Sequence, residues 1–227
     1  MTMRGADVVM RSRGILHAWS HAWIAAAVIA TLAAGLAPSG LISAAHADGD
    51  PMSVTQQTVN QALAVLRNKQ VTLADKQQQL RHIVEATFDF TEMSRSALGY
   101  HWKEISTDRQ QEFSSVFTTF VEDSYLAKIN SYSGQQVQFI KVTSDGPDYA
   151  QVNTNIVEQD QEPIRVNYHL ISESGQWKIY DVDVDSISII ANYRNQFNRV
   201  MNNRGYDTLI KDLKSKQAAL AASLASH

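Results

Sequence analysis

The spacing of apolar residues changes twice along this chain, from a helical period to an alternating one and back again. In the stretch that ends near Tyr125, large apolar side chains recur at steps of three and four, which is typical of amphipathic helices. From about Gln135 to Asp185 they alternate with polar side chains, which is typical of strands with one buried face. After Asp185 the helical period returns. The pattern therefore predicts helices on both sides of one block of strands.

Residues that start and stop helices support this interpretation. Thr72 and Asp75 have the spacing of a capping box, and Gly99 suits the left-handed residue that ends a helix. The helix that begins at Ser106 is predicted to be the longest. The predicted helices follow Pro51, follow Thr72, span 88–99, follow Ser106, run from Asp185 through Phe197, and run from Tyr206 to Ala218. Beyond Ala218 the chain is expected to fray.

The alternating block predicts an antiparallel sheet of about four strands. These strands are expected over 137–139, 150–156, 164–170 and 177–179. The links between them are short and rich in Gly, Pro, Asp and Ser, which favours hairpins over crossovers. Helices before and after one antiparallel sheet predict an α+β domain in which helices cover one face. A twisted sheet wrapped by helices encloses a cone-shaped space, which is either packed shut or kept open for a ligand.

The first 47 residues have the features of a secretory signal peptide. Arginines precede an apolar run over 24–36, and residues 45–47 read Ala-His-Ala, a cleavage site of the A-x-A kind. A retained anchor is the alternative, because 19–36 is almost long enough to span a bilayer core of about 30 Å. The absence of cysteine excludes a lipoprotein anchor and disulfides. We expect 1–47 to be cleaved and 48–227 to form a single soluble domain in the periplasm.

Composition and motifs argue against several classes of function. The formal net charge is -3 with no block of like charges, so nucleic acid is not an expected partner. His82, His101, His169 and His227 have no partner at the spacing of a metal site or catalytic triad. No G-x-S-x-G, H-E-x-x-H or phosphate-binding glycine loop occurs. We therefore expect no catalytic residue, no metal and no cofactor.

Two weaker patterns keep alternatives open. Asp181, Asp183 and Asp185 imitate the start of a calcium loop, but Ser186 occupies the position of the required glycine. Strand alternation explains these aspartates better, because it places all three on one face. Asp181 and Tyr193 are also the polar pair that a small isomerase or hydrolase would use in a cone-shaped cavity. An enzyme is therefore the alternative to a binding protein.

The segment 88–102 gathers large apolar side chains around few charges, as expected of a wall that lines something apolar. Together with 177–182 and 188–197, it resembles the MlaC-type, or toluene-tolerance, family of periplasmic phospholipid-binding proteins. The similarity covers roughly 54–213. The family has a hopanoid-associated branch, HpnM, which keeps a hopanoid-type lipid among the expected ligands. One departure is Asp185-Ser186, where relatives often carry a glycine before the serine-rich helix.

This resemblance implies an NTF2-like, cystatin-like antiparallel sheet wrapped by helices, with a helical subdomain and an apolar cavity. The cavity holds phospholipid acyl chains while the headgroup faces solvent. Such proteins, expected to be monomers, carry lipid between an outer-membrane lipoprotein–porin complex and an inner-membrane ABC transporter complex with a lipid-binding ring. This traffic maintains lipid asymmetry and solvent tolerance. No bond is made or broken, so the resemblance implies a protein that is not an enzyme.

Candidate site residues lie on the concave side of the expected fold, where ordinary core is the alternative role for each. The candidate lining residues are Phe88, Met93, Leu98, Trp102, Phe117, Val121, Tyr125, Val152, Ile156, Val166, Tyr168, Ile187, Ile190 and Phe197. Lys178 and Arg194 are candidates for contact with a headgroup phosphate at the mouth. Pairing with Asp181 or Asp183 inside the structure is their alternative.

Overall fold

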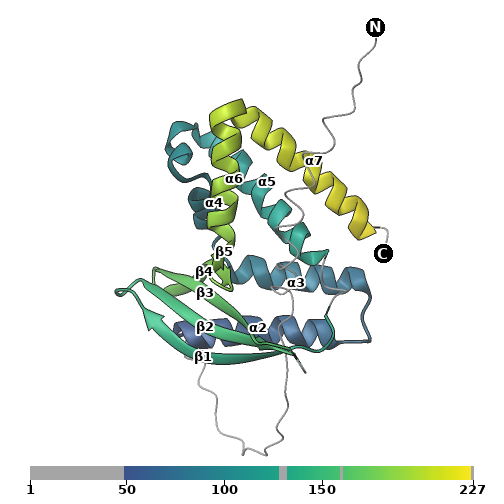
Figure 1. The fold of residues 1–227 in the computed structure, drawn as a ribbon. Helices are drawn as coiled ribbons and strands as arrows, with labels where there is room; N and C mark the ends of the chain where they lie inside the picture. The colour runs from purple at the N-terminus through teal and green to yellow at the C-terminus, as the bar shows by residue number, and fades with distance from the viewer. Residues whose placement is uncertain (1–48, 128–131, 159–160, 226–227) are drawn as a thin grey trace, which may run out of the picture.

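One antiparallel sheet, in the order β1-β2-β3-β4-β5, forms a layer of the structure (Figure 1). The structure, a computed structural model, describes residues 49–127, 132–158 and 161–225. The predicted signal peptide lies outside these residues. The strands are β1 (Gln136–Ser144), β2 (Tyr149–Val157), β3 (Ile164–Glu173), β4 (Gln176–Val184) and β5 (Ile187–Ser188). The predicted antiparallel sheet of about four strands is confirmed, with the two-residue β5 added at one edge.

Two helices begin where the sequence predicted a capping residue: Thr72 and Asp75 form both bonds of a capping box, and Ser106 caps the helix that follows. The helix expected from Asp185 begins later, at Ile189, because residues 187–188 form β5 and Ser188 caps the helix. The helical elements are α2 (Pro51–Arg67), α3 (Leu73–Thr87), α4 (Phe90–Leu98), the 3-10 helix η2 (Gly99–Glu104), α5 (Thr107–Leu126), α6 (Ile189–Arg204) and α7 (Tyr206–Ala225). Gly99 has a positive φ of 59°, as expected at a helix end.

Two details of the helix predictions are wrong. Both α5 and α7 contain 20 residues, so the helix after Ser106 is not the longest. The C-terminal helix continues to Ala225 and does not fray after Ala218. Leu220 and Leu224 explain the extension, because both pack against clusters of buried side chains formed by earlier helices.

A first core lies between the sheet and α2. Alternation along β2 and β3 buries Val152 and Val166 on the face that meets Val59 of α2. The opposite face carries polar residues such as Asn153 and Asn167, whose side-chain amides bond to each other at 2.8 Å. The sheet therefore has one buried apolar face and one polar face, as its period of two predicted.

A second core lies within α4, α5, α6 and α7, which gather on one side of the sheet (Figure 1). Aromatic rings dominate it. Phe117 is fully buried and meets Phe197 edge to face, with ring centroids 5.5 Å apart. Phe113 stacks on Phe117 at 5.4 Å. This helical subdomain therefore fills its own interior.

Two connections tie the helices to β4. Phe88 forms an isolated bridge with Ile179, and the Asp89 amide donates to the Ile179 carbonyl at 2.8 Å. At the other end of β4, Asp185 and Ser186 have φ values of 47° and 69°, which is the left-handed region that favours glycine. The turn thus keeps a left-handed shape without glycine.

None of the helices in the described part of the chain is long and apolar enough to cross a membrane.

Candidate functional site

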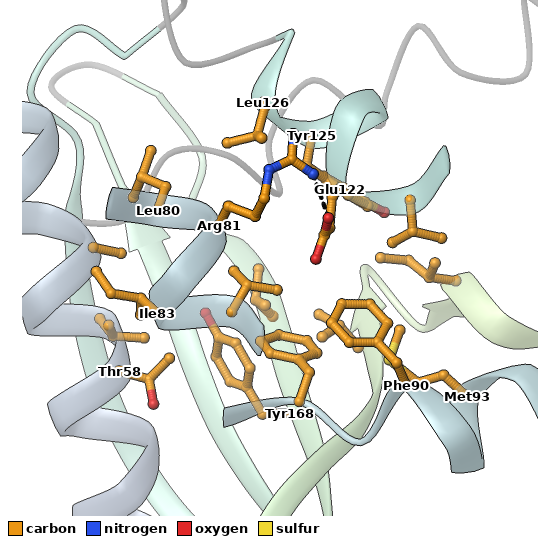
Figure 2. A pocket seen from close by; sticks show the side chains of 18 of the residues that line it. Thr58, Leu80, Arg81, Ile83, Phe90, Met93, Glu122, Tyr125, Leu126 and Tyr168 are labelled. Carbon is orange, nitrogen blue, oxygen red and sulfur yellow. Dashed lines mark hydrogen bonds and ion pairs between the residues drawn. The ribbon is translucent and has the colours of Figure 1, made fainter. Parts of the chain in front are cut away.

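An apolar cavity of about 200 Å³ lies where the sheet, α2, α3 and the helical subdomain meet (Figure 2). Every side of it comes from a different element, so it exists only in the assembled fold. The lining residues are Thr58, Val59, Ala62, Leu66, Leu80, Arg81, Ile83, Val84, Phe88, Phe90, Met93, Val121, Glu122, Tyr125, Leu126, Val166, Tyr168, Val182 and Ile189.

The walls of the cavity are almost entirely uncharged. Phe88 and Phe90 stack with ring centroids 6.2 Å apart on the side formed by the start of α4. The Thr58 hydroxyl donates to the Val54 carbonyl at 2.8 Å, which leaves its methyl group to contribute an apolar surface. Burial raises the pKa of the Tyr168 hydroxyl, so the side chain stays neutral at physiological pH. These walls suit a hydrocarbon.

One ion pair interrupts this apolar surface. Arg81 of α3 pairs through Nη1 with Glu122 Oε2 and through Nη2 with Asp123 Oδ1, the latter at 2.9 Å. Figure 2 shows Arg81 and Glu122 meeting as a bonded pair at one side of the cavity. The Arg81 side chain is 31% exposed and that of Glu122 only 4%. Burial raises the pKa of Glu122, although the Arg81 guanidinium acts in the opposite direction.

Sequence reasoning missed both charged residues. Arg81 follows Leu80 and precedes Ile83 in the apolar stripe of α3, and Glu122 directly follows Val121. A charge beside an apolar stripe is ordinarily placed on the solvent side of a helix. The sequence feature that could have identified Arg81 and Glu122 is their position at the border of an apolar stripe. Many surface residues have the same position, so the feature is weak.

The structure brings part of the predicted lining set together around the cavity. Residues of this set that line it are Phe88, Met93, Val121, Tyr125, Val166 and Tyr168. They come from the loop before α4, from the first half of α4, from the second half of α5 and from β3. Contact of these residues with a ligand stays a prediction.

The other predicted lining residues lie elsewhere. Leu98, Trp102, Phe117, Ile190 and Phe197 belong to the core of the helical subdomain or pack against it. Val152 and Ile156 are buried in the core between the sheet and α2 and do not line the cavity. Ile187 is 65% exposed. The reason is that the concave side holds two packed cores and a cavity, whereas the prediction assumed a single space.

The two predicted headgroup residues also lie away from the cavity lining. The Lys178 ammonium donates to the Ala86 carbonyl at 2.9 Å, near the end of α3. Arg194 Nε donates to the Ser96 carbonyl at 2.5 Å, and its side chain lies against Gly99. A Cβ at Gly99 would approach Arg194 Cδ to 3.3 Å. Both cations therefore bond backbone carbonyls in the last turns of helices, where their charge is favourable.

The three alternating aspartates have separate structural partners. Asp181 accepts hydrogen bonds from the Ser188 hydroxyl at 2.5 Å and from the Ile190 amide at 3.1 Å, which fixes the start of α6. Asp183 pairs with His169 at 2.9 Å. Among the residues that the structure describes, no group of three or more histidines and carboxylates is arranged to hold a metal ion.

The polar pair of the enzyme alternative is not part of the cavity. Asp181 holds the start of α6, and burial raises its pKa. Tyr193 is 3% exposed within the core of the helical subdomain. Neither residue is in the cavity lining. The cavity therefore offers an apolar surface and one ion pair, which is an arrangement for holding a molecule.

Comparison with known proteins agrees with this geometry. The chain is 22% identical over 178 residues to the "Intermembrane phospholipid transport system binding protein MlaC" of Haemophilus influenzae, covering 75% of this chain and 83% of that protein. A solved structure of a phospholipid-binding protein from Ralstonia solanacearum, in complex with a phospholipid, has a TM-score of 0.68. That likeness covers 76% of this chain and 99% of the other at 22% identity, and it shows a shared fold.

The chain also matches a protein family over most of its length. The sequence pattern of the family described as "MlaC protein" matches residues 56–215, from α2 into α7. This range includes every residue that lines the cavity. The predicted resemblance is thereby confirmed, and the chain belongs to the MlaC family.

Proposed function

We propose that this protein is a periplasmic carrier that holds the acyl chains of a phospholipid in the cavity and moves the lipid between membranes. The observation that carries this proposal is the apolar cavity between the sheet, α2, α3 and α5. Membership of the MlaC family supports it. So do the phospholipid transport system named for the Haemophilus relative and the phospholipid bound to the Ralstonia protein.

Physical chemistry explains why such a carrier needs this cavity. Each methylene exposed to water costs about 0.8 kcal/mol, so a chain of about sixteen carbons costs on the order of 12 kcal/mol. A carrier must replace the bilayer with an apolar surface of its own. Its affinity must nearly match that of the bilayer, because tighter binding would trap the lipid and weaker binding would never extract it.

The location and partners are part of the same proposal. The signal-like segment 1–47 supports export to the periplasm. We place the carrier between an outer-membrane lipoprotein–porin complex and an inner-membrane ABC transporter complex, without catalysis. A hopanoid-type lipid is a second ligand class to test, since the apolar walls suit any hydrocarbon of suitable shape.

Transfer between vesicles tests the function. The protein purified from the periplasm of expressing cells is added to donor vesicles with a deuterated phospholipid and to unlabelled acceptor vesicles. Transfer should accelerate in proportion to protein concentration, and the recovered lipid should be chemically unchanged. No acceleration would contradict the proposal, and cleaved or isomerised lipid would favour the enzyme alternative. A parallel donor with a hopanoid shows which lipid class is preferred.

A further inference from the structure

One oxygen of Glu122 has an unusual environment for a carboxylate. Its side chain is 4% exposed, and Oε2 bonds Arg81, but Oε1 is buried without a hydrogen-bond partner among the described residues. Figure 2 shows this carboxylate directed into the cavity. Buried polar atoms are nearly always bonded, so an unpartnered carboxylate oxygen beside a cavity indicates that a ligand supplies the donor.

Arg81 offers the complementary group. A guanidinium has five N–H donors, and the bonds to Glu122 and Asp123 use one from each terminal nitrogen. The Arg81 side chain lines the cavity and remains 31% exposed, so the donors not used in these two bonds are left for a ligand. Guanidinium is well suited to phosphate because its planar donors match the oxygens. An acceptor from the ligand can therefore bind next to the donor that Glu122 requires.

The surrounding charge favours a cation as that donor. Asp123 and Glu85 both act on Glu122 as like charges, against the single positive charge of Arg81. Burial also raises the pKa of Glu122, which a bound cation would reverse. A hydroxyl would satisfy the hydrogen bond but not the excess negative charge. A choline group carries the charge but has no N–H to donate.

We infer that Glu122 and Arg81 form a headgroup subsite for a phospholipid that carries an ammonium group, of which phosphoethanolamine is the simplest. The ammonium donates to Glu122 Oε1, and the phosphate accepts from Arg81. This inference rests on the proposed function, since the acyl chains must occupy the cavity for the headgroup to reach this pair. It replaces Lys178 and Arg194 as the headgroup residues.

Competition between headgroups tests the subsite. The full-length chain is expressed, and the exported protein is delipidated and incubated with vesicles of equimolar phosphatidylethanolamine, phosphatidylglycerol and phosphatidylcholine with identical acyl chains. Native mass spectrometry then counts bound lipid of each kind. We expect phosphatidylethanolamine to be retained about tenfold over phosphatidylcholine, which corresponds to about 1.4 kcal/mol. Glu122→Gln should lower this ratio to near one.

Two further variants make the result decisive. Glu112→Gln makes the same change in the same helix, at a residue that pairs with Lys214 outside the cavity, and should keep the preference. Glu122→Met leaves Arg81 paired with Asp123 and adds no unpaired buried group, so it should fold and lose the preference.

The outcomes separate the two proposals. Wild-type protein that binds lipid without preferring phosphatidylethanolamine, or that binds phosphatidylglycerol equally well, overturns the subsite and leaves the carrier function standing. Retention of the preference in both Glu122 variants overturns the subsite as well. Wild-type protein that binds none of the three lipids overturns the carrier function, and the subsite with it.

Discussion

Glu122 makes the stability of the lipid-free protein depend on pH. Burial raises its pKa from the ordinary value of 4.5, so the folded state holds the proton more tightly than the unfolded chain. The stability from this residue is therefore fully present below the unfolded pKa and is lost as pH rises through the folded pKa. Relative to Glu122→Gln, which cannot titrate there, the wild-type free energy of unfolding should fall as pH rises above 4.5 and through the raised folded-state pKa, measured by urea denaturation.

Glu112 provides a control of opposite sign. Its hydrogen bond with Lys214 lowers the pKa of this carboxyl, so its stabilising effect is present above the unfolded pKa and is lost as pH falls through the folded pKa. The wild-type free energy of unfolding relative to Glu112→Gln should therefore rise with pH below the ordinary value of 4.5, between the folded and the unfolded pKa of Glu112. Parallel stability curves for the wild type and Glu122→Gln would show that burial of Glu122 has no such effect.

The sequence predicted individual residues only as far as their spacing allowed. Alternation placed Val166 and Tyr168 on the buried face of a strand, and both line the cavity. The same kind of stripe placed Phe117 on a buried helix face, yet it meets Phe197 within a packed core. Periodicity identifies the buried face of an element but not whether another side chain or a cavity lies opposite. Glu122 was missed because a charged residue in a helix predicts a solvent-exposed position.

Among the elements, helix boundaries were predictable where a side chain caps them. Thr72 and Ser106 could be identified because a cap needs a side-chain oxygen at one position relative to the apolar stripe. The end of α7 was not predictable in the same way. Its last turns are rich in Ala and Ser, and Leu224 is stabilised by a contact with a cluster that forms only in the folded chain.

Helix α3 is the least firmly packed wall of the cavity. Leu80 is its one buried residue in the described structure, whereas α5 buries a long row of side chains. Leu80 belongs to a small cluster with Leu126, apart from the two larger cores. Elements with few buried contacts open locally at low free energy.

We therefore predict that backbone amides of α3 exchange with deuterium faster than those of α5 in lipid-free protein. Binding of phospholipid should slow exchange in α3, because an acyl chain would contact Leu80, Ile83 and Val84 along the cavity wall. Hydrogen exchange with mass spectrometry measures both rates. Equal protection of the two helices without lipid, or unchanged exchange in α3 after loading, would contradict this prediction.

Over the whole chain, two cores support the fold while the cavity between them is left open. The helical subdomain is closed by aromatic rings, and the sheet is closed by α2. The fold class could be predicted from the order of helical and alternating segments, because helices on both sides of one antiparallel block leave few possible arrangements. The division into two cores could not be predicted, because it depends on which buried faces pack against each other. Stability and ligand binding should therefore be separable by mutation.

Lipid stoichiometry by native mass spectrometry, on protein purified gently from the periplasm, tests the carrier function most directly. Val84→Trp places a large side chain into the cavity from a half-buried position, whereas Phe117→Ala removes a buried ring that does not line it. We predict about one bound phospholipid in the wild type and nearly none in Val84→Trp, with the fold intact. Phe117→Ala should keep its lipid while losing about 3–5 kcal/mol of stability. A wild type that stays empty after exposure to vesicles, or a Val84→Trp variant that binds as much lipid as the wild type, would contradict the assignment of this cavity as the lipid site.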